Sequence, residues 1–380
     1  MNVLLATDSN VERAGVCMFM LDWVRGIRQI DKDGNVVVYF RKGILDKNIA
    51  LQYKKLGAKV IYSNLPQNAS NVSIKYRNKI KRNIRSIIKR YDFDIMHVNS
   101  SAAGFASLVL SEGKKAGIPI RIAHSHGRNI GNGIKNIYLW FLKYQIKKNA
   151  TKYAGCSQDA GKYLYGESVL NSDNWCFVPN TIETDKFIYD ASIRKEYRSA
   201  LGIEDNEILL GATGMLTDIK NHIFLLPVVK MLNQKDKNVK LLILGEGEKR
   251  KELEEMCERL NIKSSVYLPG VSDKISQWLS AMDIYVMPSL IEGLPIGAVE
   301  AQANGLYCVL SSSIPNDVDL SDDVIHVTID KGATPWVNTI SKIILKSDEQ
   351  RKEGNRVVKK AGFDSSNRKD YIYKLYELDN

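Results

Sequence analysis

The stretch IYVMPSLIEGLPIGAVEAQANG, residues 284–305, predicts a buried strand, a tight turn and a helix in immediate succession. The apolar run ends at Met287, Pro288 and Gly293 mark the turn, and a helix is expected from about Pro295. The first turn of a helix has free backbone N–H groups and a partial positive charge, which suit a diphosphate. The stretch therefore predicts an α/β sheet with an anion site beyond the carboxyl end of a strand.

Two acidic residues accompany this anion site. Glu292 stands just ahead of the expected helix, and Glu300 lies farther along it. Ionised carboxylates accept hydrogen bonds from hydroxyl groups, so sugar and ribose hydroxyls are better partners for them than phosphate. The structural alternative is a capping glutamate followed by a solvent-facing one, and the spacing alone does not decide between these readings.

The same rhythm of strand and helix runs through the whole chain, in one run before residue 180 and a second from about residue 207. It predicts βαβ units, parallel sheets and the α/β class. The strand candidates are VLLAT (3–7), VVVYF (36–40), KVIYS (59–63), DIMHV (94–98), PIRIAHS (119–125), TKYAGCS (151–157) and WCFVPN (175–180), then EILLGATG, KLLILGEG, SVYLPG, IYVMPS and YCVLSS.

Length and composition indicate two globular domains. A chain of 380 residues suits two cores better than one. We expect a linker at 181–200, where charged residues replace β-rich ones, and a closing tyrosine-rich helix, NRKDYIYKLYELDN, that packs back on the first domain. No apolar run is long enough to span a membrane, and the start does not resemble a signal peptide. Five scattered cysteines favour a reducing cytoplasm.

Charge is divided unevenly between the halves. Residues 1–180 hold 28 Lys and Arg against 12 Asp and Glu (+16), and residues 181–380 hold 26 against 31 (−5). The basic run at 74–91, IKYRNKIKRNIRSIIKRY, has helical spacing, with isoleucines on one face. It is either an ordinary surface helix or a docking element for an anionic membrane, which would place the protein at the inner face of the cell membrane. Nucleic acid is disfavoured because no aromatic residues interleave the charges.

Further motifs follow one another along the chain. In order they are AHSHG (123–127), CSQDAGKYLYG (156–166), FVPNTIETDKF (177–187), GMLTDIKNH (214–222), ILGEGE (243–248) and LPGVSDKI (268–275). Together with the glutamate pair they resemble the family-4 retaining glycosyltransferases, which have the GT-B fold of two facing Rossmann-like domains with a cleft between them. The resemblance to bacterial capsule and exopolysaccharide enzymes is strongest. It implies an acceptor-binding domain at 1–185, a nucleotide-sugar-binding domain at 186–365, and a final helix at 366–380.

The resemblance also implies roles for single residues. Glu300 would hold the ribose hydroxyls, and Glu292 would contact the donor sugar and its phosphate. Lys220 would lie on the diphosphate. Where the family usually has a second cation, an arginine, this chain has Met215, and Arg128 is a candidate to replace it. The remaining donor-binding candidates are Gly293, Leu294, Pro295, Ile296, Gly15, Gly214, Gly245 and Val271.

His124 and His126 end a predicted strand, and the resemblance implies that a histidine here reaches the donor sugar. We expect alternation along the strand to direct only one of them there, and we favour His126 over His124. A metal is not expected. The Asp pairs at 92/94 and 317/319 read as surface residues, and the resembled family is metal-independent.

These observations predict a retaining glycosyltransferase that moves a sugar from a nucleotide-sugar donor, with UDP as the expected nucleotide, to a hydroxyl acceptor such as a lipid-linked glycan. No further cofactor is expected. Two alternatives stay open: a GT-B sugar epimerase or phosphorylase, and a non-catalytic, membrane-associated scaffold of the same fold. Neither a nucleophile elbow nor a Walker loop is present in the sequence.

Overall fold

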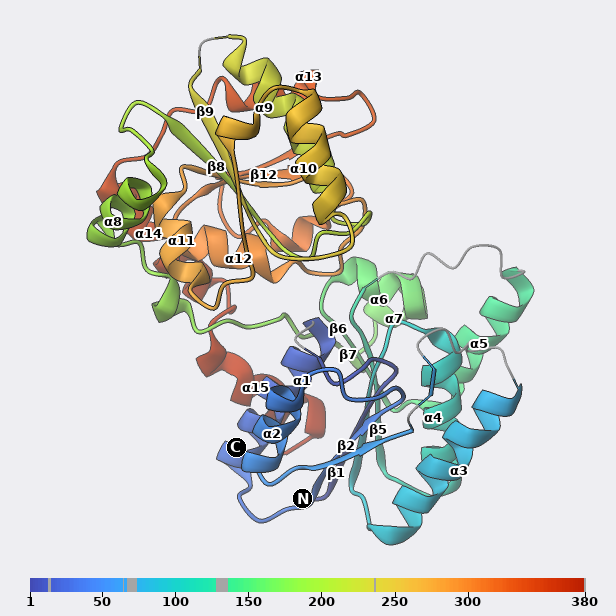
Figure 1. The fold of residues 1–380 in the computed structure, drawn as a ribbon. Coiled ribbons are helices and arrows are strands. Elements are labelled where there is room, and N and C mark those ends of the chain that lie inside the picture. The colour runs from blue at the N-terminus through green and yellow to red at the C-terminus, as the bar shows by residue number, and fades with distance from the viewer. Residues whose placement is uncertain (13–14, 64, 67–73, 128–135, 236, 379–380) are drawn as a thin grey trace. The chain divides into compact units, whose positions relative to one another are not determined.

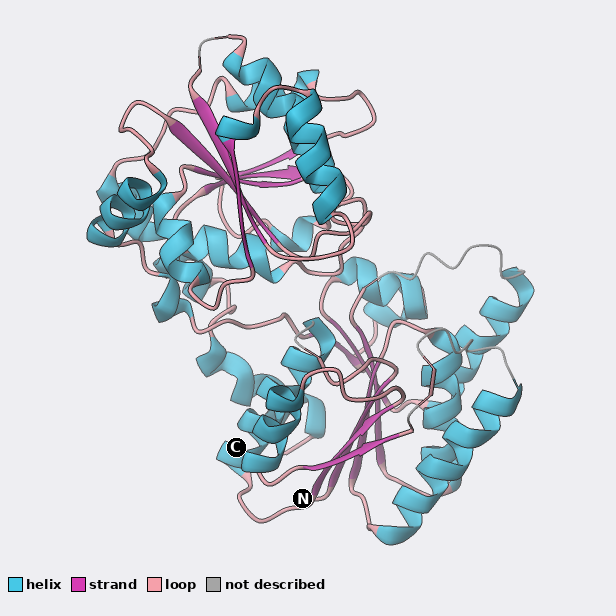
Figure 2. Ribbon diagram, viewed as in Figure 1, coloured by secondary structure: helices cyan, strands magenta, loops and turns pink. Residues whose placement is uncertain are grey.

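The computed structural model describes residues 1–12, 15–63, 65–66, 74–127, 136–235 and 237–378, which form two compact units (Figure 1). Unit 1 comprises Met1–Asn180 with Ser366–Asn380, and unit 2 comprises Thr181–Ser365. Each unit is a parallel sheet with helices on both faces (Figure 2). The α/β prediction is therefore confirmed, and the units divide after residue 180 rather than 185.

The sheet of unit 1 has the strand order β3-β2-β1-β4-β5-β6-β7. Its buried strands are continuous apolar runs, as expected where helices cover both faces of a parallel sheet. The order reverses between β1 and β4, the position at which open α/β sheets commonly bind ligands. The strands are β1 (Val3–Thr7), β2 (Val36–Phe40), β3 (Lys59–Tyr62), β4 (Ile95–Asn99), β5 (Ile120–Ser125), β6 (Lys152–Gly155) and β7 (Trp175–Phe177).

Helices cover unit 1 in two layers (Figure 1). One core cluster packs α3, α4 and α5 against the sheet, and a second packs α1, α2 and α15 against the opposite face. Helix α15 comes from the C-terminal end of the chain and lies against α1. The helices are α1 (Gly15–Ile30), α2 (Lys47–Lys55), α3 (Ile74–Arg90), α4 (Ala103–Lys115), α5 (Asn136–Asn149), α6 (Gln158–Tyr165), α7 (Glu167–Leu170) and α15 (Arg368–Tyr376).

Unit 2 repeats the plan with the order β10-β9-β8-β11-β12-β13, and its reversal lies between β8 and β11. Its strands are β8 (Ile208–Thr213), β9 (Val239–Leu244), β10 (Val266–Gly270), β11 (Ile284–Met287), β12 (Tyr307–Ser311) and β13 (Val324–Val327). Its helices are α8 (Ala191–Leu201), α9 (Leu225–Asn233), α10 (Arg250–Arg259), α11 (Ile275–Ala281), α12 (Ile296–Ala303), α13 (Thr334–Ile340) and α14 (Asp348–Lys360).

Two local expectations were wrong. The stretch 181–200 is not a linker, because it belongs to unit 2 and its second half forms α8, which packs on α11. Charged residues hold α8 in place: Arg194 and Arg198 both donate to Ala281 O at the end of α11, and both bond the carboxylate of Asp283, just beyond it, at 2.5 and 2.9 Å. Strand β13 was missed, since three of its four residues are only partly buried at the sheet edge and the strand carries a weak apolar signal.

Other features bear on where the protein acts. Among the described residues, no helix is long and apolar enough to cross a membrane. All five cysteines are free thiols and buried. In α3, Ile80, Ile84 and Ile87 are buried in the core, so the apolar face predicted from the sequence is occupied by the protein itself.

Candidate active site

The predicted donor-binding residues of unit 2 gather at one edge of its sheet. Gly214 follows β8, Gly245 follows β9, Val271 follows β10, and Glu292 lies in the loop after β11. Because β10, β9, β8 and β11 are neighbours in the parallel sheet, their carboxyl ends open at the same edge. The tertiary structure therefore brings together residues from four loops that span almost eighty positions of the chain, at the point where ligands bind such sheets.

Two of these loops touch through their glycines. Gly214 has φ of 135° and Gly245 has φ of 158°, a backbone region that other residues rarely adopt. A Cβ atom on Gly245 would lie 1.9 Å from the carbonyl oxygen of Gly214. Backbone packing therefore requires glycine at position 245. Because neither Gly214 nor Gly245 has a side chain, a ligand can approach the main chain at this edge of the sheet.

An ion pair and hydrogen bonds connect the loops after β8 and β11 across the switch point, the position at which the strand order of unit 2 reverses. Lys220 Nζ lies 2.6 Å from Glu292 Oε1 in a largely buried ion pair. The backbone N–H of Leu290 donates to Ile219 O at 2.8 Å, and the Asn221 side chain donates to Pro288 O at 3.2 Å. The two residues predicted to hold the diphosphate and the sugar are thus in direct contact, and each holds the other in position.

The start of α12 provides backbone donors beside this pair. Pro295 is its N-cap, and no side chain caps the helix. Within the described residues, the N–H groups of Gly293, Ile296 and Gly297 donate to no protein acceptor. Pro295 was predicted with them, but proline has no N–H, so it contributes only backbone geometry. Leu294 is buried and anchors the loop. These free donors and the helix dipole suit an anion.

Glu300 lies one turn into α12 with an unusual electrostatic environment. Among the described residues its carboxyl has no hydrogen-bond or ion-pair partner, and burial raises the pKa of that carboxyl to about 8. Burial raises the pKa of Tyr285, with smaller contributions from Glu300 and Glu292, and the Tyr285 hydroxyl lies 2.8 Å from Thr213 Oγ1. Ionisation of a buried carboxyl group without hydrogen-bond donors is unfavourable. A ligand that supplies such donors would stabilise the ionised form.

Helix α12 sits very close to the sheet at this point. A Cβ atom on Gly297 would lie 2.5 Å from the Tyr285 hydroxyl and 2.6 Å from Thr213 Oγ1. Glycine at position 297 therefore allows the first turn of α12 to pack closely against Thr213 of β8 and Tyr285 of β11. Tyr285 and Thr213 were missed by the sequence reasoning, although a polar residue inside an apolar strand candidate was a usable signal.

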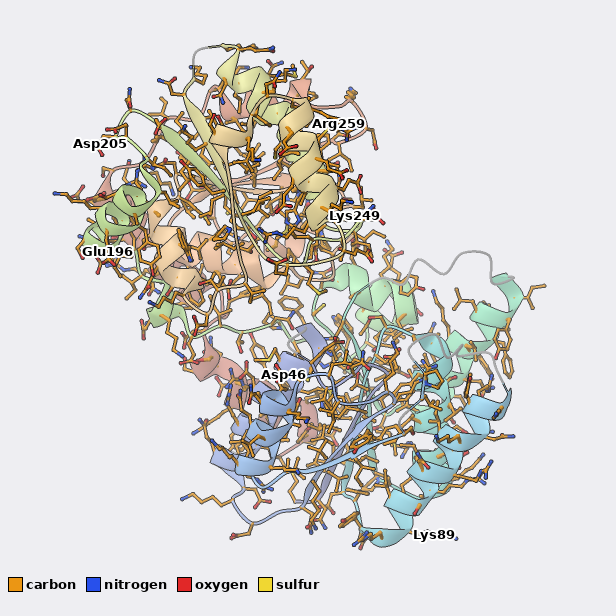
Figure 3. The ribbon with its side chains drawn as sticks, in the orientation of Figure 1. Asp46, Lys89, Glu196, Asp205, Lys249 and Arg259 are labelled. Atoms are coloured by element: carbon orange, nitrogen blue, oxygen red, sulfur yellow. The ribbon has the colours of Figure 1, made fainter. Side chains whose placement is uncertain are left out.

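Met215 is 58 % exposed at the same edge, and Val271 is also exposed. The neighbouring loop brings a cation close, because the Lys249 N–H donates to Leu216 O at 3.0 Å (Figure 3). The Lys249 ammonium is already paired with Asp218 at 2.7 Å and with Glu252 at 2.9 Å. It therefore does not supply a free charge in place of the arginine that Met215 replaces, and Arg128 lies outside the described residues.

The two predicted histidines of unit 1 lie side by side. His124 is buried in β5, His126 follows the strand, and their rings stack with centroids 4.2 Å apart. The expectation that alternation would separate them was wrong, because residues two apart in a strand point to the same face. Burial lowers the pKa of both rings, that of His126 to about 3, so both are neutral at pH 7.

A buried chain of hydrogen bonds determines which nitrogen of His124 carries the proton. Trp23 Nε1 can only donate, and it donates to the Tyr376 hydroxyl at 2.8 Å. Among the described residues the remaining acceptor for that hydroxyl proton is His97 Nδ1, at 3.2 Å. His97 then donates from Nε2 to His124 Nδ1, at 3.0 Å. His124 is therefore protonated on Nε2, a buried atom without a partner in the described part of the chain.

His126 has its own orienting partner. Its Nε2 lies 2.9 Å from Asn99 Oδ1, and the Asn99 amide donates to His97 O at 3.3 Å, which fixes the orientation of the amide. The ring thus donates from Nε2 and keeps Nδ1 as an acceptor, the atom that could bind a sugar hydroxyl.

The loops after β1 and β4 meet at the switch point of unit 1. The Ser100 hydroxyl donates to Asp8 at 2.6 Å, and burial raises the pKa of that carboxyl despite the charge of buried Arg41. This polar group was missed because Asp8 stands alone after the first strand. Gly15 begins α1 with open space around it, so its predicted role in approaching phosphate stays a prediction.

We expect Glu300→Gln to change how stability depends on pH. The folded pKa of about 8 is above the ordinary 4.5, so the stabilisation from the neutral carboxyl is complete below pH 4.5 and lost as pH rises through 8. Above pH 8 the variant should exceed the wild type in unfolding free energy by on the order of 1–3 kcal/mol. Urea unfolding from pH 5 to 9 measures this, with exposed Glu248→Gln as control. A pH-independent difference would contradict the environment described for Glu300.

Tyr376→Phe should disturb the tautomers of His97 and His124, because it removes the hydroxyl that donates to His97 Nδ1. Long-range ¹H–¹⁵N spectra of the wild type should show His124 protonated on Nε2, and the variant should show averaged shifts at both rings. Tyr373→Phe, on the same helix, is the matched control and should leave the spectra unchanged. An Nδ1-protonated His124 in the wild type would refute the chain of hydrogen bonds.

Comparisons with known proteins agree with this geometry. The family model described as Glycosyltransferase Family 4 matches residues 28–186, and that described as Glycosyl transferases group 1 matches residues 193–360. The putative glycosyltransferase EpsF of Bacillus subtilis is 29% identical over 303 residues, which are 78% of each chain. An Escherichia coli enzyme named UDP-Gal:alpha-D-GlcNAc-diphosphoundecaprenol alpha-1,3-galactosyltransferase is 25% identical over 255 residues, 65% of each chain.

Solved structures show the same fold. The crystal structure of Anabaena HepE in complex with UDP matches with a TM-score of 0.75 at 16% identity, over 98% of each chain. A sucrose-phosphate synthase from Thermosynechococcus elongatus matches with a TM-score of 0.74 at 15% identity, over 99% of this chain and 98% of that one. The two family models together cover most of both units, and the fold agrees. The chain belongs to the family-4 glycosyltransferases and has their GT-B fold.

Proposed function

We propose that the protein transfers a sugar, with retention of configuration, from a UDP-sugar to a hydroxyl group of a lipid-linked glycan. The observation that carries this proposal is the convergence of Lys220, Glu292, Glu300 and the free N–H groups of α12 at the switch point of unit 2. Cationic and amide donors suit a diphosphate, and carboxylates suit hydroxyls. A nucleotide-sugar presents both kinds of group a few ångströms apart.

Different residues of the site bind the ribose, the diphosphate and the sugar of the donor. Glu300 accepts hydrogen bonds from the ribose hydroxyls, which offset the cost of ionising a buried carboxyl group. The diphosphate lies at the start of α12, where Gly293 and Ile296 offer N–H groups. Glu292 contacts the sugar, and Lys220, now paired with Glu292 at 2.6 Å, reaches the leaving phosphate. Gly214 and Gly245 keep the adjoining loops low enough for the nucleotide to approach.

The transfer needs stabilisation of a leaving group. As the bond between the anomeric carbon and the phosphate oxygen breaks, negative charge grows on the diphosphate, where Lys220 and the helix dipole stabilise it. The acceptor hydroxyl forms the new bond from the same face, and its proton passes to the departing phosphate. Neutral His126 accepts a hydrogen bond from a sugar hydroxyl at Nδ1, and His124 supports its ring by stacking. The step uses no metal and no cofactor.

The donor and acceptor assignments draw on what relatives are named for. HepE binds UDP in its crystal, and the Escherichia coli relative is named for a galactosyl donor and a diphosphoundecaprenol acceptor. The excess of 16 positive charges in residues 1–180 suits an anionic membrane surface, where such an acceptor resides. The protein then acts on the cytoplasmic side as a peripheral membrane protein, without nucleic acid as a partner.

Donor binding and transfer test this proposal. We expect UDP and one UDP-sugar to raise the melting temperature of the wild type, and Glu300→Ala to weaken UDP binding about tenfold or more, as for loss of a charged hydrogen-bonding group. Incubation with that UDP-sugar and a synthetic lipid-linked monosaccharide, followed by NMR, should show a product with the anomeric configuration of the donor. Inversion, or a glycosyl adduct trapped on Glu292, would refute the mechanism. Release of a free epimer or sugar phosphate would favour the epimerase or phosphorylase alternative.

A separate prediction concerns the missing cation. Met215→Arg adds a positive charge at the exposed edge beside Lys220, so UDP should bind about two- to fivefold more tightly, the magnitude of a solvent-exposed ion pair. Isothermal titration calorimetry measures the affinity, and Met215→Gln separates the effect of charge from that of side-chain shape. Equal affinity of all three proteins would show that another group already neutralises the diphosphate.

A further inference from the structure

One helix of unit 1 exposes a row of large apolar side chains. Ile137, Trp140, Phe141 and Tyr144 of α5 are 82, 68, 47 and 49 % exposed. Their spacing of three, four and seven residues places them on one face of the helix. We call these four residues the α5 ridge. Burying such side chains is strongly favourable, so a contiguous exposed row marks a contact surface rather than chance exposure.

The rest of α5 shows that this exposure is not a packing failure. Leu142 and Ile146, on its other face, are fully buried in the core shared with α4. Trp140 and Tyr144 stack on each other with centroids 5.9 Å apart and planes 11° apart. The helix therefore has two apolar faces: one packs inside the unit, and the other is exposed.

The charged residues of α5 and of α3 carry a single sign. Helix α5 contains three lysines and no acid, and α3 contains eight Lys and Arg and no acid. Both helices pack on the same face of the sheet, against α4, and the Arg77 side chain bonds the Tyr138 hydroxyl to link them directly. Within the described residues, exposed Lys75, Lys79 and Arg82 of α3 pair with no acid. Lys89 projects from the far end of that helix (Figure 3).

We propose that the α5 ridge is a membrane-insertion surface, and that α5 with the cations of α3 docks unit 1 on a bilayer containing anionic phospholipid. Trp and Tyr suit the boundary between headgroups and acyl chains, where an apolar ring and a polar atom are both satisfied. The lysines and arginines beside them attract the anionic headgroups. A second copy of this chain fits less well, since two surfaces of this kind would bring like charges together.

This inference refines the membrane partner in the proposed function and rests on it for its biological purpose, yet its physical content is independent of catalysis. Ile80, Ile84 and Ile87, which the sequence pattern placed on one face of α3, are buried in the core of unit 1. The tertiary structure thus assigns the cations to α3 and the inserting side chains to α5.

Vesicle binding of the full chain tests the inference. Trp140 serves as the reporter, because Trp23 and Trp336 are buried and Trp175 and Trp278 are partly buried. On addition of vesicles of phosphatidylglycerol and phosphatidylcholine in equal parts, we expect a blue shift of the fluorescence and co-sedimentation of the protein. Vesicles of phosphatidylcholine alone should bind at least about tenfold more weakly, and added salt should weaken binding to the anionic vesicles.

Variants separate insertion from simple charge attraction. Trp140→Ser with Phe141→Ser should bind anionic vesicles at least about tenfold more weakly, which is the effect expected from removing one buried large apolar side chain. Leu45→Ser with Leu51→Ser, which removes two exposed leucines elsewhere on unit 1, is the matched control and should bind as the wild type does. Both double variants should keep the wild-type melting temperature and UDP affinity.

Three results would overturn the inference: no binding of the wild type to anionic vesicles, equal binding by the α5 variant, or a wild-type dimer that this variant dissociates in sedimentation velocity. The last would assign the α5 ridge to a second copy. Failure of the proposed function would instead appear as a lack of UDP binding or sugar transfer, measured without vesicles. Each assay can fail without the other.

Discussion

The order of strands in each parallel sheet is the constraint on which the rest of the structure depends. Where that order reverses, between β8 and β11 in unit 2, the two loops leave in opposite directions and expose the carboxyl ends of the strands. The ion pair of Lys220 with Glu292 bridges this gap at 2.6 Å and gives both loops a defined position. Helix α12 follows the loop after β11, so the same arrangement positions its free N–H groups and the carboxyl of Glu300.

Both units hold polar groups that the protein does not fully satisfy. Glu300 is kept from ionising easily by burial, and the Nε2–H of His124 has no acceptor in the described part of the chain. Groups of this kind reduce stability, so their persistence is most simply explained by ligands that complete them. In unit 1 the chain from Trp23 through Tyr376 and His97 shows how a helix from the C-terminal end of the sequence sets the chemistry of a strand near its middle.

Two helices of unit 1 expose different kinds of side chain. Helix α3 buries Ile80, Ile84 and Ile87 and presents cations, whereas α5 buries one apolar face and presents a second. Electrostatic attraction acts over about a Debye length, while apolar side chains act only on contact. A surface that combines the two can attract an anionic layer from a distance and then hold it, which a basic helix alone does poorly.

The sequence by itself determined the α/β class, nearly every strand, the glycosyltransferase family and the stretch at 284–305 that holds both glutamates, because apolar periodicity and turn residues are local signals. Tertiary structure decided what depends on long-range contact. It paired Lys220 with Glu292, set the proton position of His124 through Tyr376, placed His124 and His126 on one face, and turned 191–201 into a packed helix. The exposure of one face of α5 also required the structure, because an apolar face by itself predicts burial, whereas the packing leaves Ile137, Trp140, Phe141 and Tyr144 exposed.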